Sequence, residues 1–306
     1  MTTTPELLPE GSVVTVGSFD GVHRGHHAVL QRMASRAAEH DRATVLVTFD
    51  PHPLEVVNPS AAPMLITTPT ERREALAATD LDYVVFLRFD EGLRTMPPER
   101  FVVDLLLGRW RMRELVIGED HGFGRGRRGD VELLKRLGGE HGFAVEVVGP
   151  VIDREAGLVS STRIRTAVAH GDLRLAEVLL GRRFSMAGRV VPGAGRGREI
   201  GVRTANLLVP RRKLLPPDGV YAVWVEWAGG RNGGMLNLGA RPTVGDPKRA
   251  LEVHLFGFEG DLYGSSIRIE WVERLRDVKL FDSLTSLKHQ LTADRQAAEV
   301  ILEGGV

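Results

Sequence analysis

Apolar residues follow two different spacings along the chain as far as Leu180. Short apolar runs rich in β-branched residues predict buried strands. We expect strands at Val13–Gly17, Ala43–Phe49, Tyr83–Leu87, Leu115–Gly118 and Val145–Val148. Apolar residues at helical spacing predict the intervening helices, which we expect at His26–His40, Thr68–Thr79, Pro98–Leu107 and Asp130–Leu137.

The alternation of strands and helices predicts how this part of the chain folds. Strands joined by crossover helices pair in parallel, so we expect an open α/β sheet with helices on both faces. The first helix has an apolar stripe at Val29, Met33 and Ala37, and Thr68–Glu71 (TPTE) fits a capping box that begins the second. Sheets of this class bind ligands beyond the carboxyl ends of their strands.

The pattern changes near Gly181, where helical spacing gives way to short β runs joined by turn sequences such as Pro217–Gly219. These runs include Val220–Trp227, Gly234–Leu238, Leu251–Phe256 and Ser266–Trp271. Many short strands with turn signals predict an antiparallel sandwich or small barrel. The sequence shows no internal repeat.

One closing helix is expected near the end of the chain, where it would pack against the barrel. Its cap is Asp282 or Ser283. Its apolar spacing is carried by three leucines, Leu284, Leu287 and Leu291. We therefore expect an α/β domain over residues 1–182 and a β domain over residues 183–306.

Length and composition limit what these domains can do. The chain has 306 residues, enough for two domains of about 150 residues. Lys and Arg total 40 and Asp and Glu total 40, and this balance argues against a protein that coats a polyanion. The aromatic residues are scattered, so we expect no nucleic-acid partner. The lack of cysteine excludes disulfides, thiolate metal sites and cysteine nucleophiles.

The sequence also gives no sign of a membrane or export segment. The longest stretch without Asp, Glu, Lys or Arg is Val56–Thr70, and three prolines interrupt it. A membrane helix needs roughly 20 apolar residues. The segment Met1–Ser12 lacks the basic and apolar parts of a secretory signal. We expect a cytoplasmic protein with no membrane partner.

The first expected strand leads through a glycine-containing turn, Ser18–His26 (SFDGVHRGH), into a helix. Backbone N–H groups at a helix N-terminus form a ready anion site. His23 and His26 bracket Gly25. Imidazoles at this spacing can donate hydrogen bonds to phosphate oxygens as negative charge moves onto a leaving pyrophosphate.

Two other interpretations of these histidines stay open. The histidines could simply begin a surface helix. They could also hold a hydrolytic zinc ion, which would be completed by a carboxylate. The candidate zinc ligands are His23, His26, His27, His52, and Asp20 or Asp50.

A second candidate anion site is Ser160–Arg165 (SSTRIR), which precedes an apolar stripe at Ile164 and Val168. Its hydroxyls would cap a helix, whereas Arg163 and Arg165 in the first turn oppose the helix dipole. An anion bound at this turn would remove the conflict. Solvated arginines beside an ordinary N-cap are the alternative.

Three segments together, Val16–His26, Thr48–Pro53 and Ser160–Arg165, resemble the adenylyltransferase module of the bacterial bifunctional riboflavin kinase/FMN adenylyltransferase (FAD synthetase) family. Gly118–Gly124 (GEDHGFG) is similar to a further segment of that family, which usually has phenylalanine at the position of His121. The resemblance implies a Rossmann-like nucleotidyltransferase domain in which FMN attacks the α-phosphorus of ATP and pyrophosphate leaves. Magnesium is expected there.

The same resemblance implies roles for individual residues. It gives catalytic roles to His23, His26 and Arg165. It gives nucleotide binding to Gly17, Ser18, Phe19, Asp20, Gly25, Asp120, Ser161 and Thr162. It gives flavin binding to Phe49, Pro51, His52 and Phe123.

The β part contains a glycine-spaced loop that ends in small oxygen-bearing side chains, Thr204 and Asn206. Such oxygens suit a hard cation that carries phosphates, and glycine N–H groups suit the phosphates themselves. A turn-rich hairpin is the alternative. Further on, Leu251–Leu255 alternates, so Glu252 and His254 share one face of a strand. Glu252 could act there as a general base or be an ordinary surface glutamate.

These features, with Asn237–Thr243 and Asp261–Gly264, are similar to the riboflavin kinase signature of the same family. The resemblance implies that Glu252 accepts the proton of the riboflavin 5′-hydroxyl as it attacks the γ-phosphate. Mg–ATP would be bound by Thr204 and Asn206, and the nucleotide also by Gly193, Gly197 and Arg198. Arg203 stands where the family usually has proline.

We therefore expect a two-step enzyme with ATP as co-substrate, Mg²⁺ as cofactor, and riboflavin and FMN as ligands, acting alone or as a homo-oligomer. One alternative is a paralogue that retains a single activity or acts on a modified flavin or nucleotide. Another is a flavin-binding sensor without turnover.

Overall fold

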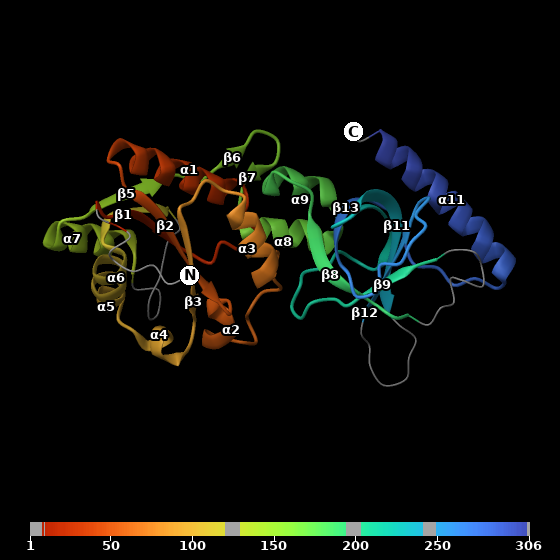
Figure 1. The fold of residues 1–306 in the computed structure, drawn as a ribbon, viewed down its shortest axis with the longest axis horizontal. Helices are drawn as coiled ribbons and strands as arrows, with labels where there is room; N and C mark the ends of the chain where they lie inside the picture. The colour runs from red at the N-terminus through yellow and green to blue at the C-terminus, as the bar shows by residue number, and fades with distance from the viewer. Residues whose placement is uncertain (1–7, 9, 120–128, 194–202, 241–248, 305–306) are drawn as a thin grey trace. The chain divides into compact units, whose positions relative to one another are not determined.

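The computed structural model describes residues 8, 10–119, 129–193, 203–240 and 249–304. The chain forms two compact units, Met1–Ser161 and Thr162–Val306 (Figure 1). The first contains a parallel sheet and the second a closed antiparallel barrel. The predicted fold class, α/β followed by β, is confirmed.

The sheet of the first unit has five parallel strands in the order β3-β2-β1-β4-β5. The strands are β1 (Ser12–Val16), β2 (Ala43–Asp50), β3 (Tyr83–Arg88), β4 (Met112–Gly118) and β5 (Ala144–Val148). Each corresponds to a strand expected from the apolar runs. The strand order reverses between β1 and β4, and such a switch point leaves a crevice at the carboxyl ends of the strands.

Helices connect these strands, and all four expected helices are present. The helical elements between the strands are α1 (Arg24–Glu39), α2 (Pro53–Val57), α3 (Pro69–Ala77), α4 (Glu91–Thr95), α5 (Pro98–Arg100), the π-helical η2 (Phe101–Leu107), α6 (Gly108–Trp110) and α7 (Val131–His141). The predicted capping box begins α3: Glu71 N–H donates to Thr68 Oγ1, and Thr68 N–H donates to Glu71 Oε2. The sequence did not predict α2 and α4, because five residues are too few to show a repeat.

Alternate side chains of the strands enter two separate cores, as a sheet covered on both faces requires. In β1, Val13 packs with residues of α1 and α3, whereas Val14 and Val16 pack with residues of η2 and α7. The predicted stripe of α1 is buried in the first core at Val29, Met33 and Ala37. Both faces of the central strands are therefore unavailable to ligands, which leaves the strand ends.

The barrel of the second unit runs in the order β10-β11-β12-β9-β8-β13 and closes between β13 and β10. Its strands are β8 (Ser185–Val191), β9 (Ala205–Leu207), β10 (Gly219–Trp227), β11 (Gly230–Ala240), β12 (Arg249–Leu255) and β13 (Ser266–Arg276). Of the two architectures expected, the small barrel is correct. Every neighbouring pair is antiparallel.

The closing helix α11 (Leu284–Glu303) packs against the barrel. Ser283 is its N-cap, and Ser283 Oγ accepts from Ser286 N–H at 3.2 Å. The buried contacts come from Ala298 and Leu302, and Leu291 of the predicted leucine stripe packs against the same cluster. Leu284 is 66% exposed, so its assignment to the apolar face was wrong.

Two further helices, α8 (Ser161–His170) and α9 (Leu173–Leu180), precede the barrel. The α9 helix ends at Gly181, with φ 78°, where the sequence pattern changes. The contacts group α9 with the second unit because it packs against β13. The sequence boundary after residue 182 follows the change in periodicity, whereas the contact boundary after Ser161 follows packing.

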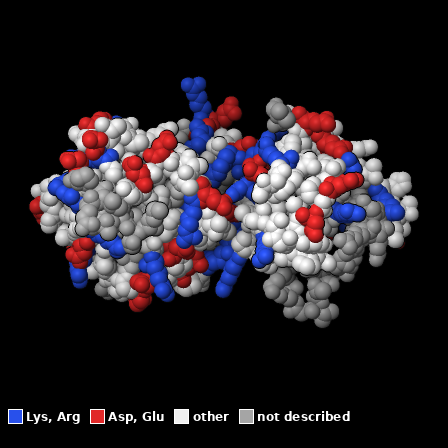
Figure 2. Space-filling view, in the orientation of Figure 1, with Lys and Arg blue, Asp and Glu red and all other residues white. Residues whose placement is uncertain are grey.

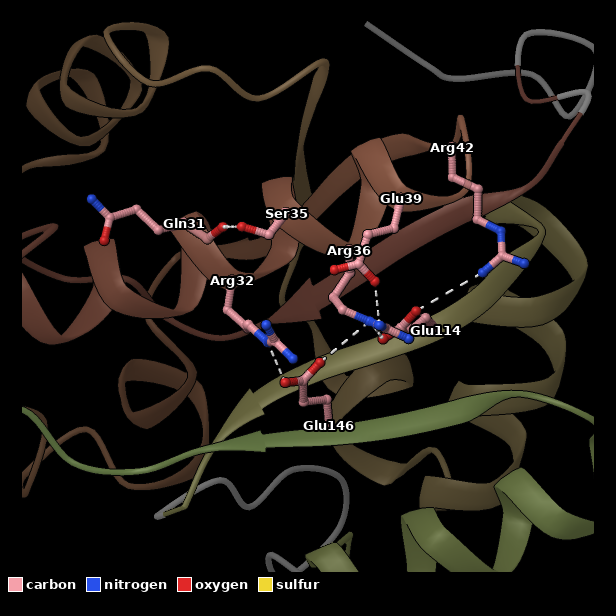
Figure 3. A network of polar contacts seen from close by, with 8 residues as sticks. All are labelled: Gln31, Arg32, Ser35, Arg36, Glu39, Arg42, Glu114 and Glu146. Atoms are coloured by element: carbon pink, nitrogen blue, oxygen red, sulfur yellow. Dashed lines mark hydrogen bonds and ion pairs between the residues drawn. The ribbon is translucent and has the colours of Figure 1, made fainter.

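Acidic and basic side chains both occur on the visible face of each unit (Figure 2). One cluster of such charges lies where α1 crosses β4 and β5 (Figure 3). Glu114 of β4 is 2% exposed and accepts from Arg36 Nε at 2.5 Å, and Arg42 lies 3.9 Å from its other oxygen. The hydrogen bond and charge of Glu114 are the main causes that raise the pKa of the Arg36 guanidinium. This cluster fixes the C-terminal half of α1 on the sheet.

Replacing Glu114 tests how much this fixation contributes to stability. In Glu114→Ala, Arg36 and Arg42 lose a buried acceptor, and the free energy of unfolding should fall by about 2 kcal/mol. Glu39 is the control, because it also pairs with Arg36 but is 48% exposed. Glu39→Ala should change stability by about 0.5 kcal/mol or less. Equal effects in urea unfolding would contradict the special role of Glu114.

Candidate active sites

The turn between β1 and α1 has an unusual backbone. Phe19, Gly21 and Val22 have positive φ values of 47°, 92° and 41°. This conformation strains residues that carry side chains, above all a β-branched one such as Val22. Gly17 packs tightly here, since a Cβ would lie 3.1 Å from the Phe19 ring. The turn ends at His23, the N-cap of α1, so the helix begins at the carboxyl end of β1.

His23 and His26 form a capping box in which both partners are histidines. His23 Nδ1 accepts from His26 N–H at 3.3 Å, and His26 Nδ1 accepts from His23 N–H at 3.2 Å. The two rings stack with centroids 3.6 Å apart, and the His26 ring lies 4.6 Å from that of Phe19. Because each Nδ1 is an acceptor, each neutral ring carries its proton on Nε2. Both imidazoles are thus held in one orientation and one tautomer.

Ser161 joins this site from a distant part of the chain. Its Oγ donates to the Asp20 carbonyl at 2.9 Å and lies 3.1 Å from His23 Nε2. Since the hydroxyl proton goes to the carbonyl, Ser161 accepts from the Nε2–H of His23, in agreement with the tautomer above. Gly25 is close as well, because a Cβ there would lie 3.1 Å from Cε1 of His23. The fold thus brings together two segments that lie more than a hundred residues apart.

The side chain of Asp20, a predicted nucleotide contact, is hydrogen-bonded to the segment before α3. Its carboxylate is 1% exposed and accepts from Ile66 N–H at 3.1 Å and from Thr67 N–H at 2.8 Å. The Thr67 hydroxyl donates to it at 3.0 Å and accepts from Gly21 N–H at 2.9 Å. Asp20 therefore ties the turn to the segment before α3, and its lone pairs are used inside the protein.

These bonds also argue against the zinc alternative. The Nδ1 atoms of His23 and His26 and the carboxylate of Asp20 accept hydrogen bonds from backbone N–H groups. His52 Nδ1 likewise accepts from Leu54 N–H, at 3.2 Å, as the N-cap of α2. Among the residues that the structure describes, no three side chains of His, Asp or Glu form a group that could hold a metal ion.

The segment after β2 was expected to contact the flavin. Pro51 and His52 are partly exposed at the carboxyl end of this strand. Phe49 differs, because its ring is 7% exposed and packs in the core, 5.5 Å from the ring of Phe89 and 6.5 Å from that of Phe101. The Phe49 ring thus packs in the core, and its role in flavin binding stays a prediction.

An ion pair that the sequence did not predict fastens the start of α1. Arg24 Nη1 donates to Asp153 Oδ2 at 2.6 Å. Asp153 lies in the hairpin of β6 (Ile152–Asp153) and β7 (Gly157–Leu158), and its other oxygen accepts from the N–H groups of Ala156 and Glu155. The bond from Ala156, followed by those from Arg24 and Glu155, lowers the pKa of Asp153 to about 2. The carboxylate is therefore charged at neutral pH.

Some of the remaining predicted site residues are described by the structure and others are not. Thr162 and Arg165 follow Ser161 in α8 and belong to the second unit. Four predicted residues lie outside the described part of the chain, namely Asp120, Phe123, Gly197 and Arg198.

The barrel contains a cavity of about 260 Å³ beside the predicted kinase residues. Gly193, Thr204 and Asn206 line it together with Asp261. Asn206 is 5% exposed, and a Cβ at Gly193 would lie 2.6 Å from Asn206 Cγ. Only glycine fits against the amide, so Gly193 makes room for the side chain of the predicted metal ligand Asn206.

His254 is hydrogen-bonded to a backbone segment that lines this cavity. Its Nδ1 lies 2.7 Å from the carbonyl of Arg203, the residue directly before Thr204, so the ring donates to that carbonyl. His254 and Arg203 both line the cavity. The bond fixes the backbone next to Thr204.

The predicted alternation of β12 is confirmed. Leu251, Val253 and Leu255 are buried, whereas Glu252 and His254 are partly exposed on the opposite face. In the strand register, Glu252 lies opposite Asn206 of β9 on one side and opposite Asn237 of β11 on the other. Directly opposed residues share one face of a sheet. Glu252 is therefore the immediate neighbour of the predicted metal ligand.

Comparison with known proteins covers both units. Residues 6–163 match the family model of FAD synthetase, and residues 180–302 match that of riboflavin kinase. The bifunctional riboflavin kinase/FMN adenylyltransferase of Escherichia coli K12 is 40% identical over 291 residues, which cover 94% of this chain and 92% of that protein. The one from Pseudomonas fluorescens is 40% identical over 299 residues, or 96% and 95% of the two chains. This chain belongs to the bifunctional riboflavin kinase/FMN adenylyltransferase family.

A crystal structure has the same architecture as this family member. It has a TM-score of 0.85 and 32% identity, and the match covers 95% of this chain and 94% of that one. Its protein, from Streptococcus pneumoniae, is named a macrolide-efflux protein. In the described residues of the present chain, no helix is both long and apolar enough to cross a bilayer.

Sequence reasoning found the family motifs but missed residues that hold them in place. These are Thr67, Arg72 and Asp153. Arg72 did leave a signal, since an arginine in the first turn of a helix opposes the helix dipole. Asp153 left none, because two-residue strands carry no readable periodicity.

The dual role of His23, as helix cap and imidazole donor, can be separated by substitution. Asparagine is a good N-cap residue, so His23→Asn should keep stability and lower FMN adenylyltransferase activity about 100-fold or more. His23→Ala should lose the same activity and also about 1 kcal/mol of stability. Full activity of His23→Asn would reduce His23 to a helix cap.

The contact between Gly193 and Asn206 can be tested in the same way. In Gly193→Ala, the methyl group should displace the Asn206 amide and lower riboflavin kinase activity about tenfold. FMN adenylyltransferase activity of the same preparation is the internal control and should stay within about twofold. Unchanged kinase kinetics would show that the amide position is unimportant.

Proposed function

We propose that this protein converts riboflavin to FMN at the barrel cavity and FMN to FAD at the β1–α1 turn, using ATP in both steps. The observation that carries the proposal is the match of both family models within one chain, each over the unit that has the corresponding motifs. We place the boundary between the two domains after residue 182. ATP, riboflavin and FMN are then the ligands, and the cytoplasm is the expected compartment.

In the adenylyl step, a phosphate oxygen of FMN would attack the α-phosphorus of ATP. The bond from that phosphorus to the bridging oxygen breaks, and pyrophosphate leaves. The Nε2–H of His26 would stabilise the charge that develops on the leaving group, and the Nε2–H of His23 would be shared between that charge and Ser161 Oγ. Ser161, Thr162 and Arg165 would hold the nucleotide phosphates. Two histidines fixed in tautomer and orientation support this role, because such donors need no reorganisation during the reaction.

Nucleotide and flavin would meet at the carboxyl end of the sheet in this step. Because Gly17 and Gly25 carry no side chain at this tightly packed turn, the nucleotide could approach its backbone closely. The remaining predicted nucleotide contacts here come from Ser18, Phe19 and Asp120. The flavin would lie toward Pro51, His52 and Phe123.

In the kinase step, the riboflavin 5′-oxygen would attack the γ-phosphorus of ATP, and ADP would leave. Glu252 would take the hydroxyl proton as general base. Its place between Asn206 and Asn237 supports this role, since its neighbour Asn206 lines the cavity where the nucleotide would bind. Gly193, Gly197 and Arg198 would contact the phosphates.

Thr204 and Asn206 fit magnesium, because both have oxygen donors and both line the same cavity. A magnesium ion bound there would neutralise charge on the ATP phosphates. The close packing of Gly193 against the Asn206 amide supports this assignment, because it leaves room for a buried oxygen-bearing side chain at the cavity.

A chromatographic time course tests both activities in one experiment. Riboflavin with ATP and magnesium should give FMN, which then converts to FAD, and chelation of magnesium should stop both steps. Glu252→Gln should abolish FMN formation but still convert added FMN. His26→Ala should accumulate FMN, with FAD formation lowered about 100-fold or more.

Two exposed residues give matched controls, Glu226 of β10 and His40 at the end of α1. Glu226→Gln and His40→Ala should leave both rates within about twofold. Only FMN from the unaltered protein would indicate a paralogue with kinase activity alone. Flavin binding without any product would identify a sensor and refute the proposal.

A further inference from the structure

Arg72 is a buried cation in the first unit that no step of the proposed reactions uses. It lies in the first turn of α3 and is 3% exposed. Its Nη1 donates to the carbonyl of Ser18 at 2.6 Å, and its Nη2 donates to the carbonyl of Phe49 at 2.5 Å. Ser18 follows β1 and Phe49 lies at the end of β2, so one side chain joins the carboxyl ends of two neighbouring strands.

The burial of this guanidinium is unfavourable in itself. Burial lowers the pKa of Arg72, and the charges of Asp20 and Asp50 offset this only in part. Its Nε is buried and has no hydrogen-bond partner among the described residues. A neutral side chain of similar size would avoid the desolvation of a charge. The arginine, however, fixes the positions of the Ser18 and Phe49 carbonyls.

The segment that Arg72 holds is the strained one. Ser18 directly precedes the positive φ values of Phe19, Gly21 and Val22. Backbone strain persists only where the surrounding structure determines it. The Ser18 carbonyl accepts a second bond, from Thr48 Oγ1 at 3.1 Å, so its position is determined from both α3 and β2.

We propose that Arg72 is a positioning residue for FMN adenylyl transfer. By bridging the Ser18 and Phe49 carbonyls, it sets the turn that carries His23 and His26 at a fixed distance from the flavin segment after β2. Without the bridge, the strained turn can relax, and the two imidazole donors move relative to the flavin. This inference rests on the proposed adenylyl transfer.

The test compares Arg72→Met and Arg72→Lys with Arg73→Met in the full-length protein. Arg73 is the matched control, because it is the next residue of α3, also lies over the Phe86 ring, and is 50% exposed. For each variant we would measure kcat and KM of adenylyl transfer, the stoichiometry of FMN binding, and riboflavin kinase activity as an internal control.

Arg72→Met should lower kcat about 100-fold per molecule that binds FMN, because a displacement of about 1 Å has effects of this size. Arg72→Lys keeps the charge but offers one nitrogen for two carbonyls, so we expect a loss of about tenfold. Arg73→Met and the kinase activity of all variants should stay within about twofold. A purely structural arginine would lower the FMN-binding fraction and leave kcat per binding molecule unchanged.

That second outcome, in either Arg72 variant, would overturn the inference. Arg72→Lys decides the question if Arg72→Met does not fold. The proposed function fails separately, since it requires the unaltered protein to form FAD from added FMN. A protein that forms FAD but tolerates both substitutions would refute only the role of Arg72.

Discussion

The backbone of Ser18–Val22 is the constraint on which the first unit depends. Left-handed conformations at Phe19 and Val22 are unfavourable, so this turn needs fixed partners on every side. The backbone of Ile66 and Thr67, which binds Asp20, and the side chain of Arg72 supply two of them from the region of α3, and Ser161 supplies a third at the opposite end of the unit's sequence. As a result, α1 begins with two histidines whose rings are held by the capping hydrogen bonds of the helix.

The second unit solves a similar problem with a regular scaffold. Its predicted functional side chains lie in one row of an antiparallel sheet, where the register alone places Glu252 beside Asn206. Strain is not needed, because neighbouring strands already bring the two side chains together. What the barrel needs instead is space, which Gly193 leaves for the Asn206 amide. One unit therefore depends on buried charges and the other on strand register.

The sequence predicted elements well and tertiary partners poorly. Ala43–Asp50 and α1 follow from periodicity, because their burial repeats at regular intervals. The alternation of Glu252 and His254 was readable for the same reason. In contrast, nothing local to Asp20 shows that Ile66 and Thr67 will consume its carboxylate. Likewise, the Phe49 ring is in the core because Phe101 of η2 and Phe89, which follows β3, lie beside it, and no local pattern records these contacts.

Asp20 and Phe49 have a common consequence for the use of family motifs. Both lie within segments that resemble the family, yet their side chains face the protein interior. A motif around a strained turn must preserve the residues that hold the turn as well as those that touch the substrate, since losing either displaces the same donors. Membership in a motif therefore identifies the site as a whole. Hydrogen bonding then separates its residues, because the His23 ring lies against the Ser161 hydroxyl whereas the Asp20 carboxylate is bonded to the backbone before α3.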